Sequence, residues 1–231
     1  MSTFAEGQIH QLADSLEVAG FTSAHITKLG QLGEGLSQVM AFLDGRAEIV
    51  MKKVETTVVS ILTFVKTVAV PAVAGKETAN CFTDESRYAY RDSDLDAWLP
   101  INQPAQLAGK FSVQRLTRGG TFKSAVESFL GMTAEIPVLA AELKKRGHVT
   151  TLAVIESLIE RQENGEDVGL RTDGWWDFFF VEDGEGGVSV VYTRRDDGDG
   201  QWHVYVRHLD GDVVWHDGSR FFFRNTDTVS L

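Results

Sequence analysis

Histidine and aspartate side chains gather near the C-terminus, and these residue types can bind metals or carry protons. Six of them lie within fifteen residues: His203, His208, Asp210, Asp212, His216 and Asp217. Two histidines five positions apart on a strand point to opposite faces, however, and no familiar ligand spacing is present. A metal-dependent or other enzyme that uses the His203, His208 and His216 region is therefore kept as an alternative, while no metal site or cofactor is predicted.

Three shorter motifs have the residue types of known sites but not their spacing. Residues 197–200, Asp-Gly-Asp-Gly, resemble a calcium loop but lack its distal glutamate, so they predict a turn. Residues 118–124 contain the ingredients of a phosphate loop in the wrong order. The single cysteine, Cys81, has no nucleophile motif around it and is predicted to be a buried or half-buried thiol. These motifs predict no catalytic residue.

The composition is that of an acidic globular protein. The 231 residues carry a formal net charge of −11, which disfavours binding to nucleic-acid phosphates. The N-terminus lacks the basic segment and apolar run of a secretory signal. The most apolar window, 56–74, contains Lys66 and Pro71 and is interpreted as buried core rather than as a membrane span. We therefore expect a cytoplasmic protein with no nucleic-acid and no membrane partner.

Helical spacing of apolar residues predicts two N-terminal helices. Ile9, Leu12 and Leu16 recur three or four positions apart before Gly20, a typical stop. A second helix, with an apolar stripe over residues 23–43, follows hydroxyl residues that can cap it. Such a pair either packs internally or mediates a homo-oligomer.

The middle of the chain is less regular. The β-branched segment 47–74 predicts mixed structure, and the polar, turn-rich segment 78–120 is interpreted as an irregular linker. Helices are predicted over 121–146 and 151–162. Their order resembles a helix–turn–helix, but the second carries glutamates where a DNA-reading helix presents donors and cations, so two helices packed on the sheet are the preferred interpretation.

Aromatic and β-branched runs separated by Asp-Gly turns predict a C-terminal sheet. We expect short antiparallel strands at 175–181, 188–194, 201–209 and 220–224. Alternation in the third strand assigns its side chains to two faces. One face has Trp202, Val204, Val206 and His208, and the other has His203, Tyr205 and Arg207.

Two phenylalanine triplets and a shift in composition distinguish this sheet further. Phe-Phe-Phe at 178–180 and at 221–223 does not alternate, which predicts strands covered on both faces. No Glu follows Glu185, and the segment after it also lacks Lys and Met. The remaining Asp, Arg, His, Tyr, Trp, Ser, Gly and Asn are typical of binding surfaces that combine rigid aromatics with adaptable hydrogen-bonding groups.

Residues 150–225 carry motifs of a known group. They include Thr150-Thr151-Leu152, Asp173-Gly174 before an aromatic strand, and the closing Trp215-x-x-Gly218-x-Arg220-x-Phe222-x-Arg224-Asn225. This segment resembles the end of the variable proteins of diversity-generating retroelements and of a group of bacterial proteins similar to them. The resemblance implies a C-type-lectin-like, formylglycine-generating-enzyme-type domain. In such proteins, miscopied template adenines diversify chosen codons without producing Glu, Lys or Met.

The resemblance also implies two sets of residues. A fixed scaffold would consist of Gly174, Trp202, Val204, Leu209, Trp215, Gly218, Arg220, Phe222, Arg224 and Asn225. Interleaved residues would face a ligand, and these are Tyr192, Arg194, Asp196, Asp197, His203, Tyr205, Arg207, His208, Asp212, His216 and Ser219.

Together these observations predict an α+β protein with three parts. We expect a helical or mixed region over 1–77, an irregular linker over 78–120, and C-terminal helices with a C-type-lectin-like sheet domain over 121–231. The predicted function is a ligand-binding display protein without enzymatic activity, whose unknown ligand is a protein. The alternatives are the enzyme described above and a structural or oligomerisation protein.

Overall fold

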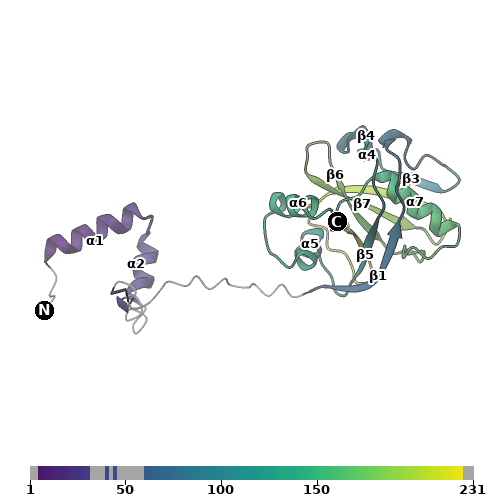
Figure 1. Cartoon of the computed structure of the whole chain (residues 1–231). Coiled ribbons are helices and arrows are strands. Elements are labelled where there is room, and N and C mark those ends of the chain that lie inside the picture. Colours follow the sequence, from purple (N-terminus) through teal and green to yellow (C-terminus); the bar gives the residue numbers. More distant parts are fainter. Residues whose placement is uncertain (1–4, 32–39, 42–43, 46–59, 226–231) are drawn as a thin grey trace. The chain divides into compact units, whose positions relative to one another are not determined.

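The computed structural model describes residues 5–31, 40–41, 44–45 and 60–225. The chain divides into two compact units, residues 1–55 and residues 56–231 (Figure 1). Helices and a mixed sheet are both present, so the expected α+β class is confirmed.

The first unit contains the two predicted helices. Helix α1 (Glu6–Val18) stops before Gly20, whose φ of +83° suits a residue without a Cβ. Helix α2 (Ser23–Gly30) follows Thr22, whose hydroxyl accepts a hydrogen bond from the His25 amide at 3.4 Å. Both helices are confirmed, whereas most of the predicted continuation of the second one to residue 43 lies outside the described residues.

The second unit is built around a seven-stranded sheet with the order β1-β5-β9-β6-β7-β8-β3. Its strands are β1 (Leu62–Val70), β3 (Tyr88–Arg91), β5 (Gly109–Leu116), β6 (Asp177–Glu182), β7 (Val188–Arg195), β8 (Trp202–His208) and β9 (Arg220–Asn225). A two-stranded sheet pairs β2 (Lys76–Glu77) with β4 (Asn102–Gln103). The helices are η1 (Thr78–Asn80), α4 (Asp94–Trp98), α5 (Phe122–Leu130), α6 (Ile136–Lys145) and α7 (Leu152–Glu163).

The phenylalanine triplets form the centre of this sheet. Strands β6 and β9 run parallel with Phe178 opposite Phe221 and Phe179 opposite Phe222. All six rings of the triplets are 0% exposed, so the prediction of strands covered on both faces is confirmed. Because side chains alternate along a strand, Phe179 and Phe222 join one hydrophobic cluster, while the outer four rings join a second cluster on the opposite face.

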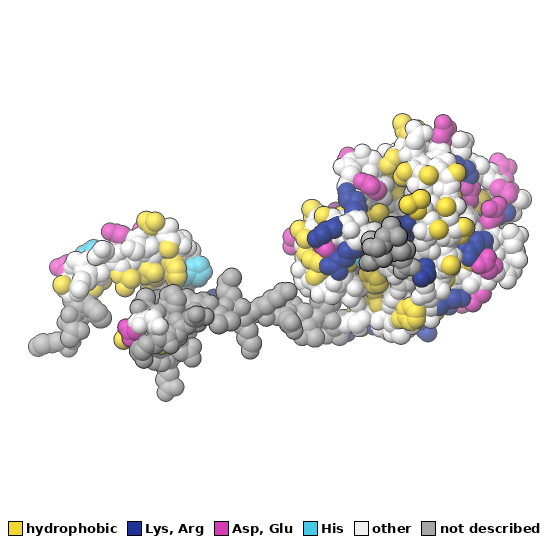
Figure 2. All heavy atoms as spheres, viewed as in Figure 1, with side chains coloured by type: hydrophobic (Ala, Val, Ile, Leu, Met, Phe, Trp, Pro, Cys, Tyr) yellow, Lys and Arg dark blue, Asp and Glu magenta, His cyan; other side chains and the backbone are white. Residues whose placement is uncertain are grey.

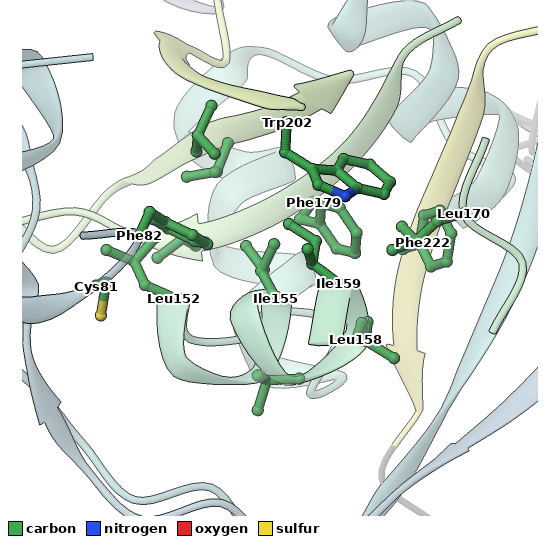
Figure 3. Packing of buried hydrophobic residues seen from close by; sticks show 14 of the residues in the cluster. Cys81, Phe82, Leu152, Ile155, Leu158, Ile159, Leu170, Phe179, Trp202 and Phe222 are labelled. Atoms are coloured by element: carbon green, nitrogen blue, oxygen red, sulfur yellow. The ribbon is translucent and has the colours of Figure 1, made fainter. Parts of the chain in front are cut away.

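Helices cover both faces of the centre. Leu152, Ile155 and Ile159 of α7 pack against the face that carries Phe179, Phe222 and Trp202 (Figure 3). Helices α5 and α6 contribute their apolar side chains to the cluster on the other face. The helix predicted over 121–146 is divided into α5 and α6. Helices α6 and α7 lie on opposite faces of the sheet rather than together as a helix–turn–helix.

The prediction that residues 78–120 form an irregular linker is wrong. This segment supplies β3 at one edge and β5 beside β9, where Val113 pairs with Phe222. Phe111 and Val113 are 0% exposed. Phe111, Ser112, Val113 and Gln114 alternate as in a strand, but only the neighbouring strands give this segment its place in the sheet.

The four predicted C-terminal strands are confirmed as strands, but their arrangement is not a simple antiparallel meander. Strands β6, β7 and β8 pair consecutively and antiparallel, as expected. Strand β9 instead lies on the other side of β6 and parallel to it, and β3 pairs parallel to β8. The sheet is mixed because these two pairs are parallel while its other pairs are antiparallel.

The apolar window over 56–74 becomes an edge strand for most of its described part. Residues 56–59 lie outside the described ranges, and β1 buries Val68 and Val70 while Phe64 and Val65 are exposed. None of the helices in the described ranges combines the length and the hydrophobicity that a bilayer crossing requires.

A buried carboxyl group fixes the start of β6. Asp177 is 0% exposed, and its Oδ2 accepts a hydrogen bond from the Arg171 amide at 2.7 Å. Its other oxygen has no partner. Burial raises the pKa of Asp177 well above its usual value, against the opposing effects of the Arg171 amide and the Arg220 guanidinium. This carboxyl orients the chain at Trp176, the residue directly before the strand.

The replacement Asp177→Asn tests this burial. The pKa of Asp177 is higher in the folded state than in the unfolded state. Its contribution to the free energy of unfolding is therefore complete at low pH and is lost as pH rises through the folded pKa. The wild type should therefore lose stability relative to D177N by about 1.4 kcal/mol for each pH unit between the two pKa values. Denaturant unfolding of both proteins between pH 4 and pH 8 measures this.

The exposed carboxyl of Glu182, on the same strand, provides the matched control as Glu182→Gln. A difference between wild type and D177N that stays constant across this pH range would contradict the assigned shift.

Candidate functional site

A group of aromatic side chains crosses the sheet near its β3 edge. Tyr90 of β3, Tyr192 of β7, and His203 and Tyr205 of β8 belong to it, together with Trp176 before β6; we call these five residues the aromatic face. The register of the strands brings them together, because Tyr192 lies opposite Tyr205 and Tyr90 lies opposite His203. The rings of Tyr192 and Tyr205 stack at 5.2 Å, and Tyr90 lies 4.7 Å from Tyr205.

The helical cover over this side of the sheet ends within the aromatic face. Phe122, the first residue of α5, packs 5.2 Å from Phe178 and 6.4 Å from Tyr192. Tyr192 is consequently buried, Tyr205 is half-buried, and Tyr90 is 42% exposed. The aromatic face thus grades from buried core to open surface toward the sheet edge.

Trp176 ties the aromatic face to the loop between β8 and β9. Its ring meets Tyr205 edge-on at 5.6 Å and lies 5.8 Å from Trp215 of that loop. Trp215 also lies 5.3 Å from Tyr192, and the Trp215 amide donates to the Gly120 carbonyl at 2.8 Å. The loop is therefore anchored beside the aromatic face by its tryptophan.

Basic side chains accompany the aromatic face. The Arg194 guanidinium lies 4.9 Å from the centre of the Trp176 ring and donates to Asp196 at 2.8 Å. Arg207 is exposed on the same side of β8 as His203. The Nε2 atom of His203 is buried without a hydrogen-bond partner, although Asp199 Oδ2 lies 3.5 Å away. These groups leave hydrogen-bonding capacity next to apolar rings.

Tyr192 and Tyr90 of the aromatic face keep their protons at neutral pH. Burial raises the pKa of Tyr192 above its ordinary value, and desolvation raises the pKa of Tyr90 in the same direction. Neutral phenols both donate and accept hydrogen bonds. The surface can therefore offer aromatic contact and hydrogen bonds without a charged phenolate.

Four of the residues predicted to face a ligand lie together on this side of the sheet. Arg194, His203 and Tyr205 are half-buried, and Arg207 is exposed. His203, Tyr205 and Arg207 alternate along β8 with Val204 and Val206, which are 0% exposed on the opposite face, so the two faces predicted for this strand are confirmed.

Two residues of the same predicted set point inward. Tyr192 is 4% exposed and stacks between core aromatics, and Ser219 is 0% exposed with an unpartnered hydroxyl. Their prediction as exposed ligand contacts is wrong, because α5 covers Tyr192 and the sheet encloses the start of β9.

The other five residues predicted to contact a ligand do not belong to the aromatic face. Asp196 and Asp197 form the turn after β7, in which Asp196 accepts the Gly198 amide at 2.9 Å, and residues 197–200 make the predicted turn. His208 lies on the opposite face, where its ring stacks on Trp98 at 4.0 Å. Asp212 and His216 are exposed on the loop that Trp215 anchors.

The residues predicted as scaffold lie mainly inside the unit. Trp202, Val204, Leu209, Gly218, Phe222 and Arg224 are buried, while Gly174, Trp215, Arg220 and Asn225 are half-buried. The indole of Trp202 donates to Glu163 of α7 at 2.9 Å, which links β8 to the helix beneath it. Gly218 has a φ of +99°, a conformation that a Cβ would strain.

The metal-binding alternative has no assembled ligand set. In the described ranges, no group of three or more His, Cys, Asp or Glu side chains is placed to hold a metal ion. His203 and His208 face opposite sides of the sheet, as alternation predicted. Cys81 is buried, as expected, and burial, reinforced by Glu156, raises the pKa of its thiol to about 11. That pKa leaves little thiolate for nucleophilic chemistry at neutral pH.

Sequence reasoning missed Tyr90 and Trp176. Tyr90 falls in the segment predicted as a linker, and a register shift between Tyr88 and Tyr90 puts these two tyrosines on opposite faces of β3 although they are two positions apart. Trp176 was placed inside a strand rather than before it. Neither residue could be joined to β8 from the sequence, because the pairing of β3 with β8 spans more than a hundred positions.

Comparison of the chain with protein-family models, with curated proteins and with solved structures found no match.

Proposed function

We propose that the unit of residues 56–231 is a non-enzymatic binding module that holds a protein ligand on the aromatic face. The observation that carries this proposal is the graded exposure of stacked aromatic rings beside two arginines at the sheet edge. Tyrosine, tryptophan and arginine are the residues that most often dominate protein–protein binding energy. Their rings are rigid here, so little side-chain entropy is lost when a partner covers them.

Rigid support below the rings strengthens this proposal. Tyr205 stacks on buried Tyr192, which in turn contacts Phe122 and Phe178. The exposed ring of Tyr90 rests on Tyr205. A partner that packs on Tyr90 would therefore meet a surface held in place by the core rather than a flexible loop.

Replacement of Tyr90 by alanine tests the aromatic face as a binding surface. Loss of the exposed Tyr90 ring should weaken partner binding at least about tenfold, and Arg207→Ala should also weaken it. Quantitative mass spectrometry of proteins captured from the producing cells by the full-length chain measures this. Ile101→Ala is the matched control, since Ile101 is 77% exposed and lies outside the aromatic face.

Partners recovered equally with wild type, Y90A and I101A would contradict this use of the surface.

We further propose, from the motifs in residues 150–225, that this surface belongs to a retroelement-diversified variable domain of the C-type-lectin-like kind. The arrangement of β8 supports the proposal, because exposed or half-buried His203, Tyr205 and Arg207 alternate with buried residues. Such side chains can change without opening the core. Tyr192 and Ser219 no longer belong to the proposed variable set, because both are buried.

Gene copies from closely related strains test the diversification. Substitutions should concentrate at codons 194, 196, 197, 203, 205, 207, 208, 212 and 216, while the buried residues Tyr192, Trp202 and Ser219 stay constant. The surrounding locus should contain a reverse transcriptase and a near-repeat of the 3′ coding segment that differs at adenines. Substitutions spread evenly over buried and exposed codons would count against diversification without touching the binding role itself.

A second proposed role, self-association, is favoured by the first unit. Helices α1 and α2 expose apolar side chains, among them Ile9, Leu12 and Ile26, which are 42% to 60% exposed (Figure 2). These side chains line a hollow of about 570 Å³ between the two helices. Isolated short helices gain most of their stability from packing an apolar face, so a second copy of this unit is a suitable cover.

The double replacement of Leu12 and Ile26 by glutamine tests self-association. Light scattering of the full-length chain should show an oligomer for the wild type and a lower mass for L12Q/I26Q, because the apolar contact is lost. Val138→Gln changes a similarly exposed apolar residue on α6 and should leave the mass unchanged. A monomeric wild type would contradict this role.

A further inference from the structure

A second cavity lies apart from the aromatic face. It has a volume of about 390 Å³ and opens where the first turn of α7 meets the loop over residues 100–106, the β6–β7 turn and the end of β9. Pockets for small molecules begin near about 300 Å³, so this one suits a small ligand rather than a macromolecule.

The N-cap residue of α7 lines this cavity and has an unpartnered hydroxyl. Thr151 is the N-cap residue, and its side chain makes no capping hydrogen bond. Threonine at this position ordinarily accepts a hydrogen bond from an amide of the first turn. Thr151 is only 7% exposed, yet its Oγ1 atom has no partner. The Leu152 amide donates to Gln103 Oε1 at 3.4 Å and the Val154 amide donates to the Thr151 carbonyl at 3.2 Å, so the Thr151 hydroxyl is the unpartnered group at this helix start. The positive end of the helix dipole lies beside it and favours an anion.

An amide donor borders the same cavity. The Gln106 side-chain oxygen accepts a hydrogen bond from the Thr150 hydroxyl at 3.1 Å. The Nε2 atom of Gln106 is buried and has no hydrogen-bond partner. Two unsatisfied polar groups, Thr151 Oγ1 and Gln106 Nε2, thus line one pocket.

A buried positive charge completes the set. Arg224 lines the cavity, is 8% exposed, and donates from Nη2 to the Leu107 carbonyl at 3.0 Å. Among the described residues, no carboxylate forms an ion pair with it. Buried charges are normally paired, because an unpaired one costs solvation energy that nothing offsets.

The two carboxylates at the rim are already engaged. Glu182 pairs with Lys144 at 3.4 Å, and Asp183 Oδ1 accepts the amides of Glu185 and Gly187 at 3.0 and 2.7 Å. The rest of the lining is partly apolar, with Pro100, Val149 and Val181 among its residues. The cavity therefore combines unsatisfied donors and a positive charge with room for a small apolar body.

We propose that this cavity binds the carboxylate or phosphate group of a small molecule, held by Arg224, Thr151 and Gln106. The oxyanion supplies the counter-charge that Arg224 lacks and a partner for Thr151 Oγ1 and Gln106 Nε2, and the guanidinium geometry suits either a carboxylate or a phosphate. The neutral part of the ligand lies along the apolar wall. This site is independent of the aromatic face, because the two share no residue.

Calorimetric titration of the full-length chain with three probes tests the proposal. Inorganic phosphate and benzoate distinguish the two kinds of oxyanion, and benzamide is a neutral match for benzoate. We expect saturable binding of at least one anion and none of benzamide. Thr151→Val should weaken that binding about tenfold or more, because it removes a hydrogen bond to a charged group. Arg224→Gln, which keeps a donor for Leu107, should weaken it at least as much.

Thr193→Val is the matched control. Thr193 is 0% exposed and, like Thr151, has an unpartnered hydroxyl, but it lies on β7 outside the cavity. T151V and T193V should therefore unfold at similar temperatures, while only T151V loses affinity. If T151V does not fold, amide chemical shifts of wild-type Leu152 and Ala153 should still move during the titration.

Three results would overturn the proposal. These are the absence of saturable binding of either anion at millimolar concentration, equal binding of benzoate and benzamide, and chemical-shift changes that avoid the start of α7.

Discussion

The parallel pairing of two phenylalanine triplets is the constraint on which the second unit depends. Strands β6 and β9 each carry large rings at three consecutive positions, so both faces of each strand are apolar there. Both faces must therefore be covered by other parts of the chain. Helix α7 supplies one cover, and α5 with α6 supplies the other. Strands recruited from residues 62–116 then extend the sheet around this centre.

This construction also explains where a surface is left for binding. The helical cover is deepest over β6 and β9 and ends at Phe122, which reaches Tyr192 but not the β3 edge. Rings continue beyond that point from β7 through β8 to β3. The result is a continuous aromatic group, buried at one end and exposed at the other. Both rigidity and accessibility follow from the same incomplete cover.

The two proposed sites use different physics. The aromatic face offers rings and neutral phenols over a wide surface, which suits a protein partner. The cavity at the start of α7 offers a buried guanidinium and unsatisfied donors in a small volume, which suits an oxyanion. The aromatic face takes its residues from β3, β7 and β8 and from Trp176, whereas the cavity is lined by the ends of β6 and β9 and the segments around them. The two sites share no residue, so we expect loss of one to leave the other intact.

The sequence by itself determined the local elements of the C-terminal segment and the faces of β8. Alternating side chains and Asp-Gly turns are short-range signals, and they predicted four strands, the split between His203 and Val204, and the double cover of the triplets. Partners distant in the chain were decided only by the tertiary structure. Whether β9 lies beside β8 or β6 depends on which neighbour completes a two-sided core, and nothing within β9 encodes that choice. For the same reason Tyr90, Tyr192 and Arg224 acquired their exposure and their sites only when the sheet assembled.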